Sequence, residues 1–539
     1  MSDIAVSTES SSRSPLAEEV ARRRTFAIIS HPDAGKTTLT EKLLLFGGAI
    51  NLAGQVKAKG ERRSTRSDWM KIERDRGISV VTSVMTFEFE GLVFNLLDTP
   101  GHEDFSEDTY RTLTAVDSAV MVIDAAKGIE DRTRKLFEVC RLRDIPIITF
   151  INKMDRESRD PFDLLDEIEK TLALDTTPMT WPVGRGRDFL GTYDITTGGV
   201  RLLEGGGAKT GEAEQIAIAD LAGRNPNLDA AAVTEELELV SEACKPFDLG
   251  SFREGHLTPV FFGSALRNFG VGDLLEGLGR YAPPPRAQEA SVRRVEASEP
   301  KMSAFVFKIQ ANMDPNHRDR IAFARLCSGK LTRGMKSKLV RTGKNMTLSS
   351  PQFFFAQDRA IADEAFAGDV VGIPNHGTLR IGDTLTEGED IAFVGVPSFA
   401  PEILRRVRLG DAMKAKKLKE ALQQMSEEGV VQVFRPRDGS PAMVGVVGQL
   451  QLDVLKARLD AEYSLPVDFE ISEFQLARWF TAEDPKAFDT FVNANGSSIA
   501  EDVDGDLVFL ARNEFYLGYT RERSPGITFT SIKDVKKAA

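Results

Sequence analysis

The amino-acid sequence predicts an α/β domain built on a mostly parallel sheet, followed by a small β-barrel and a mixed α+β domain. Short apolar runs alternate with helix-like stretches through the first 280 residues, which is the pattern of a parallel sheet flanked by helices. Further on, β-branched and aromatic runs are separated by glycine-containing turns, and after about residue 396 helix-like and strand-like segments alternate. The 539 residues suffice for about three or four domains.

The first sheet is expected to contain five apolar runs as strands, at residues 26–29, 93–97, 119–123, 145–151 and 260–262. Sheets of this class bind ligands at the carboxyl ends of their strands, so functional residues are expected on the loops that follow these runs. The stretch between Asp155 and Val260 is longer than one strand-helix unit needs, and it holds an acidic helix-like segment at 230–243. We therefore expect an inserted subdomain at about residues 185–258.

The limits of the domains follow from breaks in these patterns. Three consecutive prolines at 283–285 cannot continue a helix and favour an extended linker, so the first domain is expected over 24–286, after an N-terminal extension of residues 1–23. The β-barrel is expected over 300–395, with turns at 328–329 and 333–334. The α+β domain is expected over 396–539; its last 60 residues show no readable chemistry.

Composition excludes several classes of protein. Hydrophobic residues make up 41% and charged residues 28%, as in ordinary globular proteins, and no apolar run approaches the roughly 18 residues of a membrane span. The first 24 residues lack the apolar core of a secretory signal. Cys140, Cys244 and Cys327 are far apart and indicate neither a disulfide framework nor a zinc site. We expect a cytoplasmic protein that does not contact membranes.

The net charge of −12 argues against a protein that coats nucleic acid nonspecifically. The charge is uneven, because residues 301–340 carry nine Lys or Arg against two Asp, a local charge of +7. A second basic stretch runs from Lys414 to Lys419. Each stretch either contacts RNA or solvates a surface, and the sequence leaves both possibilities open.

The loop after the first apolar run has the composition of a phosphate-binding loop. The sequence SHPDAGKT at 30–37 stands between an expected strand and an expected helix. Backbone N–H groups of residues 31–36 would cradle phosphates, Lys36 would neutralise the β and γ phosphates, and Thr37 would offer its hydroxyl to Mg²⁺. Ser30 replaces the usual first glycine, so an ordinary glycine turn before a helix is the alternative.

Two further motifs follow expected strands. The sequence DTPGH at 98–102 begins with Asp98, where a carboxylate can hold Mg²⁺ through water, and Gly101 lets the loop move toward a γ phosphate. By itself this motif is also a common turn. The sequence NKMD at 152–155 places Asp155 to accept hydrogen bonds from the N1 and N2 donors of guanine, a pair that adenine lacks. Residues 264–266 would place backbone N–H groups on the guanine oxygen.

Together with Arg76-Gly77-Ile78-Ser79, these motifs resemble the signature of translational GTPases of the elongation factor G/Tu type. In this family the first loop position is often not glycine. The resemblance implies binding of GTP and GDP with Mg²⁺, held by Thr37, Ser79 and Asp98. It also implies that His102 is catalytic and orients the attacking water when the ribosome pushes it into place, and that residues 55–79 are ordered with GTP and disordered after hydrolysis. The expected nucleotide-binding residues are Ser30, His31, Pro32, Asp33, Ala34, Gly35, Lys36, Thr37, Thr38, Asp98, Thr99, Pro100, Gly101, His102, Asn152, Lys153, Met154, Asp155, Ser264, Ala265 and Leu266.

Within this superfamily the chain resembles the peptide chain release factor 3 family of bacteria, on residues 30–42, 328–334, 434–436 and 448–451. Elongation factor G continues through two further domains, for which the residues after Trp479 are expected to be too few. The resemblance implies a ribosome-stimulated GTPase that promotes dissociation of class I release factors after peptide release. Its expected partners are ribosomal RNA and proteins and class I release factors, and off the ribosome it is expected to be a monomer. A translocase-like or rescue GTPase, or a noncatalytic guanine-nucleotide switch, are the alternatives.

Overall fold

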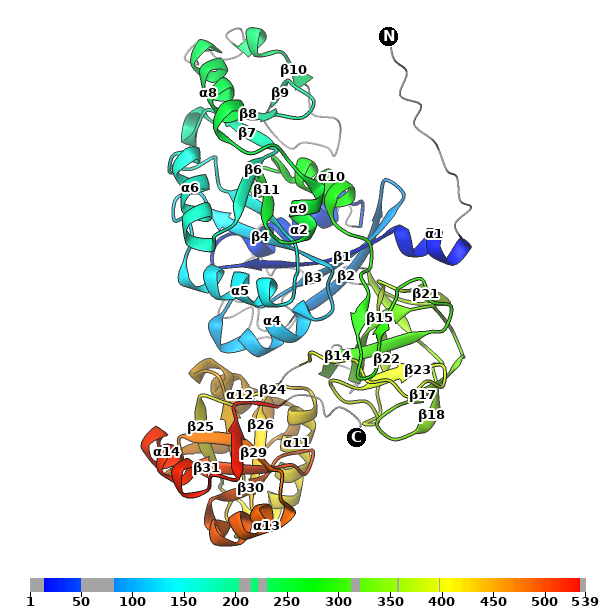
Figure 1. The fold of residues 1–539 in the computed structure, drawn as a ribbon, viewed down its shortest axis with the longest axis vertical. Coiled ribbons are helices and arrows are strands. Elements are labelled where there is room, and N and C mark those ends of the chain that lie inside the picture. The colour runs from blue at the N-terminus through cyan, green and yellow to red at the C-terminus, as the bar shows by residue number, and fades with distance from the viewer. Residues whose placement is uncertain are drawn as a thin grey trace.

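The computed structural model describes residues 14–49, 82–202, 215–221, 230–311, 320–355, 358–396 and 398–533. An α/β part lies at the top of Figure 1, a β-rich part lies below it on the right, and an α+β part forms the bottom. Within the described ranges, none of the helices combines the length and apolar character that crossing a membrane requires. The domain limits given above stay predictions.

The α/β part is organised around a seven-stranded sheet with the order β2-β3-β1-β4-β5-β11-β6. Neighbouring strands run parallel except for β2, which is antiparallel to β3. The strands are β1 (Arg23–Ser30), β2 (Ser83–Phe89), β3 (Leu92–Asp98), β4 (Ser118–Asp124), β5 (Ile147–Asn152), β6 (Asp175–Pro178) and β11 (Leu257–Phe262). The five expected strands are adjacent in the centre of the sheet, and the predicted fold class is confirmed.

Helices cover both faces of this sheet because alternate residues of each strand point to opposite sides. Ala27 and Ile29 of β1 pack in a cluster with residues of α5 and α6, whereas Phe26 and Ile28 pack in a second cluster with residues of α2 and α10. The helices are α1 (Pro15–Ala21), α2 (Lys36–Phe46), α4 (Ser106–Leu113), α5 (Asp131–Leu142), α6 (Pro161–Leu172), α9 (Leu249–Arg253) and α10 (Val271–Tyr281). A 3-10 turn, η2 (Glu103–Phe105), precedes α4.

A smaller antiparallel sheet with the order β10-β9-β8-β7 extends from the α/β part, in the stretch where the sequence predicts an inserted subdomain. Its core consists of Val183, Val200, Leu221 and Val233. The elements are β7 (Thr180–Val183), η3 (Gly186–Asp188), β8 (Gly191–Asp194), β9 (Val200–Leu202), β10 (Gln215–Ile216), η4 (Ile218–Asp220) and α8 (Ala230–Ala243). The ion pair between Arg201 of β9 and Asp273 of α10 attaches this sheet to the main one.

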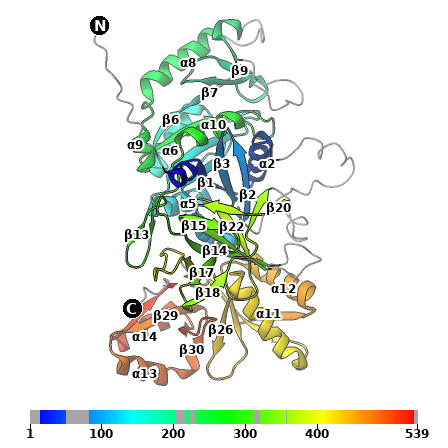
Figure 2. The ribbon, with the colours of Figure 1, turned by 90° about the vertical axis from the view of Figure 1, so that its right-hand side faces the viewer.

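The β-rich part contains an eight-stranded sheet with the order β18-β17-β23-β14-β15-β22-β19-β20 and the pair β16-β21, which confirms the expected β-barrel. In Figure 2 it lies between the other two parts. Its strands are β14 (Ser303–Ala311), β15 (Arg320–Ser328), β16 (Lys330–Thr332), β17 (Lys336–Leu339), β18 (Lys344–Thr347), β19 (Gln352–Phe355), β20 (Asp358–Ile361), β21 (Glu364–Phe366), β22 (Val370–Pro374) and β23 (Thr384–Thr386). The short pair β12 (Gln288–Glu289) and β13 (Arg294–Val295) precedes it.

The α+β part has one eight-stranded sheet with the order β28-β25-β27-β26-β30-β31-β29-β32, as the predicted α+β class requires. The pairing of β26 with β30 joins the residues after Phe480 to the first half of the sheet. Its strands are β24 (Ser398–Phe399), β25 (Ile403–Leu409), β26 (Gln432–Pro436), β27 (Met443–Val446), β28 (Val467–Ile471), β29 (Leu476–Ala482), β30 (Ile499–Glu501), β31 (Leu507–Ala511), β32 (Ile527–Thr530) and β33 (Ile532–Lys533). Its helices are η5 (Ala412–Lys414), α11 (Ala415–Glu427), α12 (Gln449–Tyr463), α13 (Pro485–Ala494), η6 (Gly496–Ser498) and α14 (Glu514–Arg523).

Candidate nucleotide site

Four loops that follow β1, β3, β5 and β11 meet at the carboxyl edge of the seven-stranded sheet, because these strands are parallel and close together. Lys36 Nζ, at the start of α2, lies 2.5 Å from Asp98 Oδ1 at the end of β3, and both side chains are buried. Asn152 at the end of β5 donates from Nδ2 to the Ala34 carbonyl at 2.8 Å. These contacts bring the three predicted motifs into one site.

The backbone of the loop at 30–37 lies so close to Asn152 that it needs glycine at position 35. Gly35 has a φ of +97°, and a Cβ at this position would lie 2.3 Å from Asn152 Nδ2, so both the conformation and the space require glycine. Gly35 is the N-cap of α2 and provides no side-chain hydrogen bond to the first turn of that helix. Ser30 Oγ and His31 Nδ1 are buried without a hydrogen-bond partner among the described residues. Unsatisfied polar groups in a loop that leads into a helix N-terminus fit an anionic ligand.

The second end of the site is built from the loops after β5 and β11. Lys153 Nζ donates to the Asp33 carbonyl and lies 2.7 Å from Asp124 Oδ2. The Ala265 N–H donates to Asn152 Oδ1 at 2.9 Å and the Ser264 N–H donates to the Phe269 carbonyl at 3.0 Å. Two of the three backbone donors predicted for the guanine oxygen therefore already have protein partners.

The carboxylate expected to read guanine is largely shielded from solvent. The Asp155 side chain is 10% exposed, and its Oδ2 lies 3.7 Å from Nε of Arg267, which is 61% exposed. The backbone N–H of Met154, one residue earlier, donates to the Gly263 carbonyl at 3.1 Å, which fixes this loop against the end of β11. Asp155 therefore lies on a loop that is hydrogen-bonded to the end of β11, and its ion-pair partner, Arg267, is a long and exposed side chain.

His102 lies in a loop against the first one, since a Cβ on the neighbouring Gly101 would be 3.7 Å from Pro32 Cα. The His102 side chain is 38% exposed, and its Nδ1 accepts a hydrogen bond from the Asp104 N–H at 3.3 Å. The next residue, Glu103, is hydrogen-bonded by Lys135, which lowers the pKa of the Glu103 carboxyl below its usual value. His102 is therefore the residue next to the contact between the two loops, and its partly exposed imidazole lies against Asp104.

Two site residues escaped the sequence analysis. Asp124 ends β4 and pairs with Lys153, and Glu130 Oε1 lies 3.2 Å from His31 Nε2. Asp124 follows the apolar run at 119–123 as Asp98 follows its own run, so the same strand-end signal was present for it. Glu130 has no such signal. Ser79 and the segment 55–79 lie outside the described residues, so the structure does not place them.

Comparison with known families identifies the class of protein. The model for the elongation factor Tu GTP-binding domain matches residues 21–284, and the model for elongation factor G domain 2 matches residues 301–388. The model for the C-terminal domain of class II release factor RF3 matches residues 393–521. A crystal structure of a protein from Thermus thermophilus aligns with a TM-score of 0.68 and 25% sequence identity, covering 86% of this chain and 69% of that one.

The chain therefore belongs to the translational GTPases: it binds guanine nucleotides and hydrolyses GTP. Within that superfamily the match of its last domain makes it a release-factor-3-type GTPase. The translation-factor domains imply interaction with the ribosome. The roles of individual site residues stay predictions.

Proposed function

We propose that this protein is a ribosome-stimulated GTPase of translation termination that promotes dissociation of class I release factors after peptide release. The observation that supports the proposal most is the match of residues 393–521 to the RF3 C-terminal domain, on the same chain as the GTP-binding domain. A protein of this kind acts in the cytoplasm, where ribosomes are found, and off the ribosome we propose that it is a monomer.

Positioning and charge neutralisation are the main demands of phosphoryl transfer, and the residues of this site suit both. We assign Lys36 and the backbone N–H groups of residues 31–36 to the phosphates. Because Lys36 pairs with Asp98 here, nucleotide binding exchanges this ion pair for contacts between Lys36 and phosphate oxygens. Asp155 reads the guanine base after Arg267 moves aside.

The donor set also fits a magnesium ion. The Thr37 hydroxyl and the Asp98 carboxylate are hard oxygen ligands at the entrance to the phosphate loop, and Mg²⁺ prefers such ligands together with substrate phosphates. Thr37 and Asp98 would hold it, with Ser79 as a third ligand implied by the family resemblance. When bound, the ion would neutralise charge on the β and γ phosphates.

His102 is the proposed catalytic residue. Its loop lies against the phosphate loop, and its imidazole is accessible to solvent. On the ribosome, His102 orients the water that attacks the γ phosphate. In the free protein we expect slow turnover, because the ribosome is needed to push His102 into place beside the attacking water.

The α+β part carries a basic surface suited to ribosomal RNA. Lys416, Lys417 and Lys419 are exposed on the first turns of α11, next to Lys414. Clustered lysines attract phosphate groups without reading sequence. We propose that this surface contacts the ribosome.

The test uses ribosomes that have completed termination and still hold a class I release factor labelled with a fluorophore. GTP hydrolysis and departure of the labelled factor are followed in the same reaction, with and without this protein. Strong stimulation of hydrolysis together with faster departure is the expected result. Stimulation without departure would indicate a translocase-like or rescue GTPase, and no stimulation would indicate a noncatalytic switch.

A further inference from the structure

Asp104 connects the loop of His102 to the C-terminal α+β part. Its Oδ2 accepts a hydrogen bond at 2.7 Å from the backbone N–H of Leu450, in the first turn of α12. Gly448 is the N-cap of α12 and offers no side chain for this purpose. The carboxylate of Asp104, 346 positions before Leu450, caps the helix instead. A negative charge at a helix N-terminus is favourable because it accepts hydrogen bonds from N–H groups that have no partner within the helix. It is also attracted by the positive end of the helix dipole.

The same residue also holds the predicted catalytic imidazole. The Asp104 backbone N–H donates to His102 Nδ1 at 3.3 Å, and Asp104 Oδ1 lies 3.4 Å from that nitrogen. One aspartate therefore contacts the histidine with its backbone and one carboxylate oxygen, and the α12 helix with the other oxygen.

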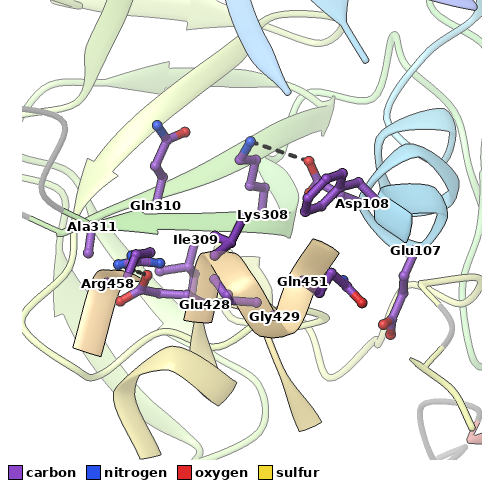
Figure 3. Close-up of a pocket in the computed structure, with 13 residues that line it drawn as sticks. Glu107, Asp108, Lys308, Ile309, Gln310, Ala311, Glu428, Gly429, Gln451 and Arg458 are labelled. Atoms are coloured by element: carbon purple, nitrogen blue, oxygen red, sulfur yellow. Dashed lines mark hydrogen bonds and ion pairs between the residues drawn. The ribbon is translucent and has the colours of Figure 1, made fainter. Parts of the chain in front are cut away.

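The surroundings make this a rigid connection. Asp108 of α4 pairs with Lys308 of β14 at 3.5 Å (Figure 3). Asp108 also accepts two hydrogen bonds from Thr82. Burial opposes ionisation of Asp108, but Lys308 and Thr82 together bring the pKa of its carboxyl below the usual value. Tyr110, two residues further along α4, packs edge-on against Phe399 of β24. The helix that follows His102 is thus fixed to both other parts of the molecule.

A small cavity of about 60 Å³ lies at the meeting point of the three parts. Phe105, Asp108, Lys308 and Gln451 are among the residues that line it. Its walls are therefore supplied by η2 and α4, by β14, and by the first turn of α12. The contact between Asp104 and Leu450 lies beside this junction, because Phe105 and Gln451 directly follow these two residues in the chain.

We propose that Asp104 is a positioning residue that orients His102 for GTP hydrolysis, and that the N-terminus of α12 holds Asp104 in place. The proposal rests on the proposed function, because it requires His102 to act on the attacking water. It makes the position of the C-terminal part a determinant of the turnover rate and not of nucleotide binding.

A substitution at Gly448, in the C-terminal part, can disturb the contact between Asp104 and Leu450. A Cβ at Gly448 would lie 2.0 Å from Asp104 Cγ, a distance that real contacts do not reach, so Gly448→Ala displaces the carboxylate. The φ of Gly448 is −144°, an extended conformation that alanine adopts freely. Gly410 offers a matched control in the same domain, because a Cβ there meets nothing within 4 Å.

The experiment measures single-turnover GTP hydrolysis on ribosomes by the full-length chain and by Asp104→Ala, Gly448→Ala, Gly410→Ala and the double variant D104A/G448A. We expect D104A and G448A each to lower the maximal rate about tenfold, the effect of losing one charge-assisted hydrogen bond. The half-saturating ribosome concentration and the GTP affinity stay unchanged, and G410A behaves as the parent. The double variant is no slower than D104A, since both changes break the same contact.

Three other outcomes would overturn the proposal. A higher half-saturating ribosome concentration at an unchanged maximal rate would show that Asp104 only orients the domains for binding. Additive losses in the double variant would show that Gly448 and Asp104 act separately. Normal rates in both single variants would remove Asp104 from catalysis. His102→Ala, assayed in parallel, separates these results from failure of the proposed function: if H102A retains stimulated turnover, the role of His102 is wrong as well.

Discussion

Two buried ion pairs with the same chemistry have different surroundings in this molecule. Lys36 and Asp98 lie 2.5 Å apart at the nucleotide site, and Arg325 and Asp117 lie 2.5 Å apart between β15 and the loop before β4. All four side chains are at most 6% exposed. The two pairs differ in their other contacts. We interpret Lys36–Asp98 as part of a ligand site and Arg325–Asp117 as a permanent joint within the fold.

In the joint both charged partners also bind backbone groups, while Arg325 Nε has no hydrogen-bond partner among the described residues. Asp117 Oδ1 also accepts the Arg286 N–H at 2.9 Å, and Arg325 Nη1 donates to the Gly368 carbonyl at 2.7 Å. Near Lys36, Ser30 Oγ and His31 Nδ1 have no hydrogen-bond partner within the described ranges, and both belong to the predicted phosphate loop. Buried polar groups are normally satisfied. We expect phosphate oxygens to satisfy the groups of the predicted phosphate loop, whereas the Arg325–Asp117 pair acts within the fold.

Breaking the ion pair between Arg325 and Asp117 should give the largest effect, a loss of folding stability. Replacing Arg325 by Met leaves the Asp117 carboxylate buried without its cation, which we expect to lower the free energy of unfolding by about 3–5 kcal/mol. Urea denaturation measures this change. Lys170→Met is the matched control, because Lys170 and Asp166 form a pair whose side chains are 74% and 57% exposed, worth about 0–1 kcal/mol. Equal losses in both variants would remove the special role of the buried network.

The corresponding change at the nucleotide site should act on binding more than on folding. Lys36→Met removes the positive charge assigned to the phosphates, and we expect GTP affinity to fall about 100-fold, or about 2.7 kcal/mol. Titration calorimetry gives the affinity, and urea denaturation without nucleotide gives the stability. A variant that binds GTP normally but unfolds several kcal/mol more easily would place Lys36–Asp98 with the structural pairs.

Asp155 provides a third case, a carboxylate with an exposed and easily displaced partner. We expect Asp155→Asn to weaken GTP binding about tenfold, because the amide replaces one of two acceptors for guanine by a donor. The variant should gain affinity for xanthosine nucleotides, whose base has an acceptor where guanine has its amino group. Competition of guanosine and xanthosine diphosphates measures the preference, and an unchanged preference would remove Asp155 from base recognition.

Asp273 gives the smallest expected effect and tests the attachment of the antiparallel sheet through Arg201. Burial raises the pKa of Asp273 to about 6, above its ordinary value of 3.8, although Arg201 opposes the shift. A raised pKa means that the folded state gains stability when Asp273 is protonated, and this stability is lost progressively as the pH rises from 3.8 through about 6.

Asp273→Asn should remove this loss. Relative to the parent, the free energy of unfolding of D273N is expected to increase by about 1 kcal/mol between pH 5 and pH 7. Denaturation of both proteins at a series of pH values isolates the contribution of Asp273, because their other titrating groups are the same. A difference between the two proteins that does not vary with pH would contradict it.

The sequence predicted those features that depend on neighbouring residues. Five apolar runs became the central strands because a strand buried on both faces must be apolar along its length. β2 and β6 were not predicted, since Thr86 and Glu88 interrupt the first and Asp175-Thr176-Thr177-Pro178 makes up the second, at the two edges of the sheet. The phosphate loop and the motifs after β3 and β5 were readable because each follows its strand directly.

The junctions were not readable, because they depend on residues far apart along the chain. Asp104 and Leu450 are separated by 346 positions, and Asp117 and Arg325 by 208. No local sequence pattern around Asp104 or Gly448 predicts that these two residues come into contact. Gly448 belongs to the motif at 448–451, but the sequence does not show why glycine is needed there. The need arises in the folded protein, where a Cβ at Gly448 would collide with Asp104.

The central claim is that this translational GTPase uses His102 to hydrolyse GTP when a ribosome is present. The most direct measurement is single-turnover GTP hydrolysis by the parent and by His102→Ala, each with and without post-termination ribosomes, alongside GTP affinity. We predict unchanged affinity and slow basal hydrolysis in both proteins, with ribosome stimulation lost in H102A by about 100-fold or more. Stimulation of H102A to the parental rate would contradict it.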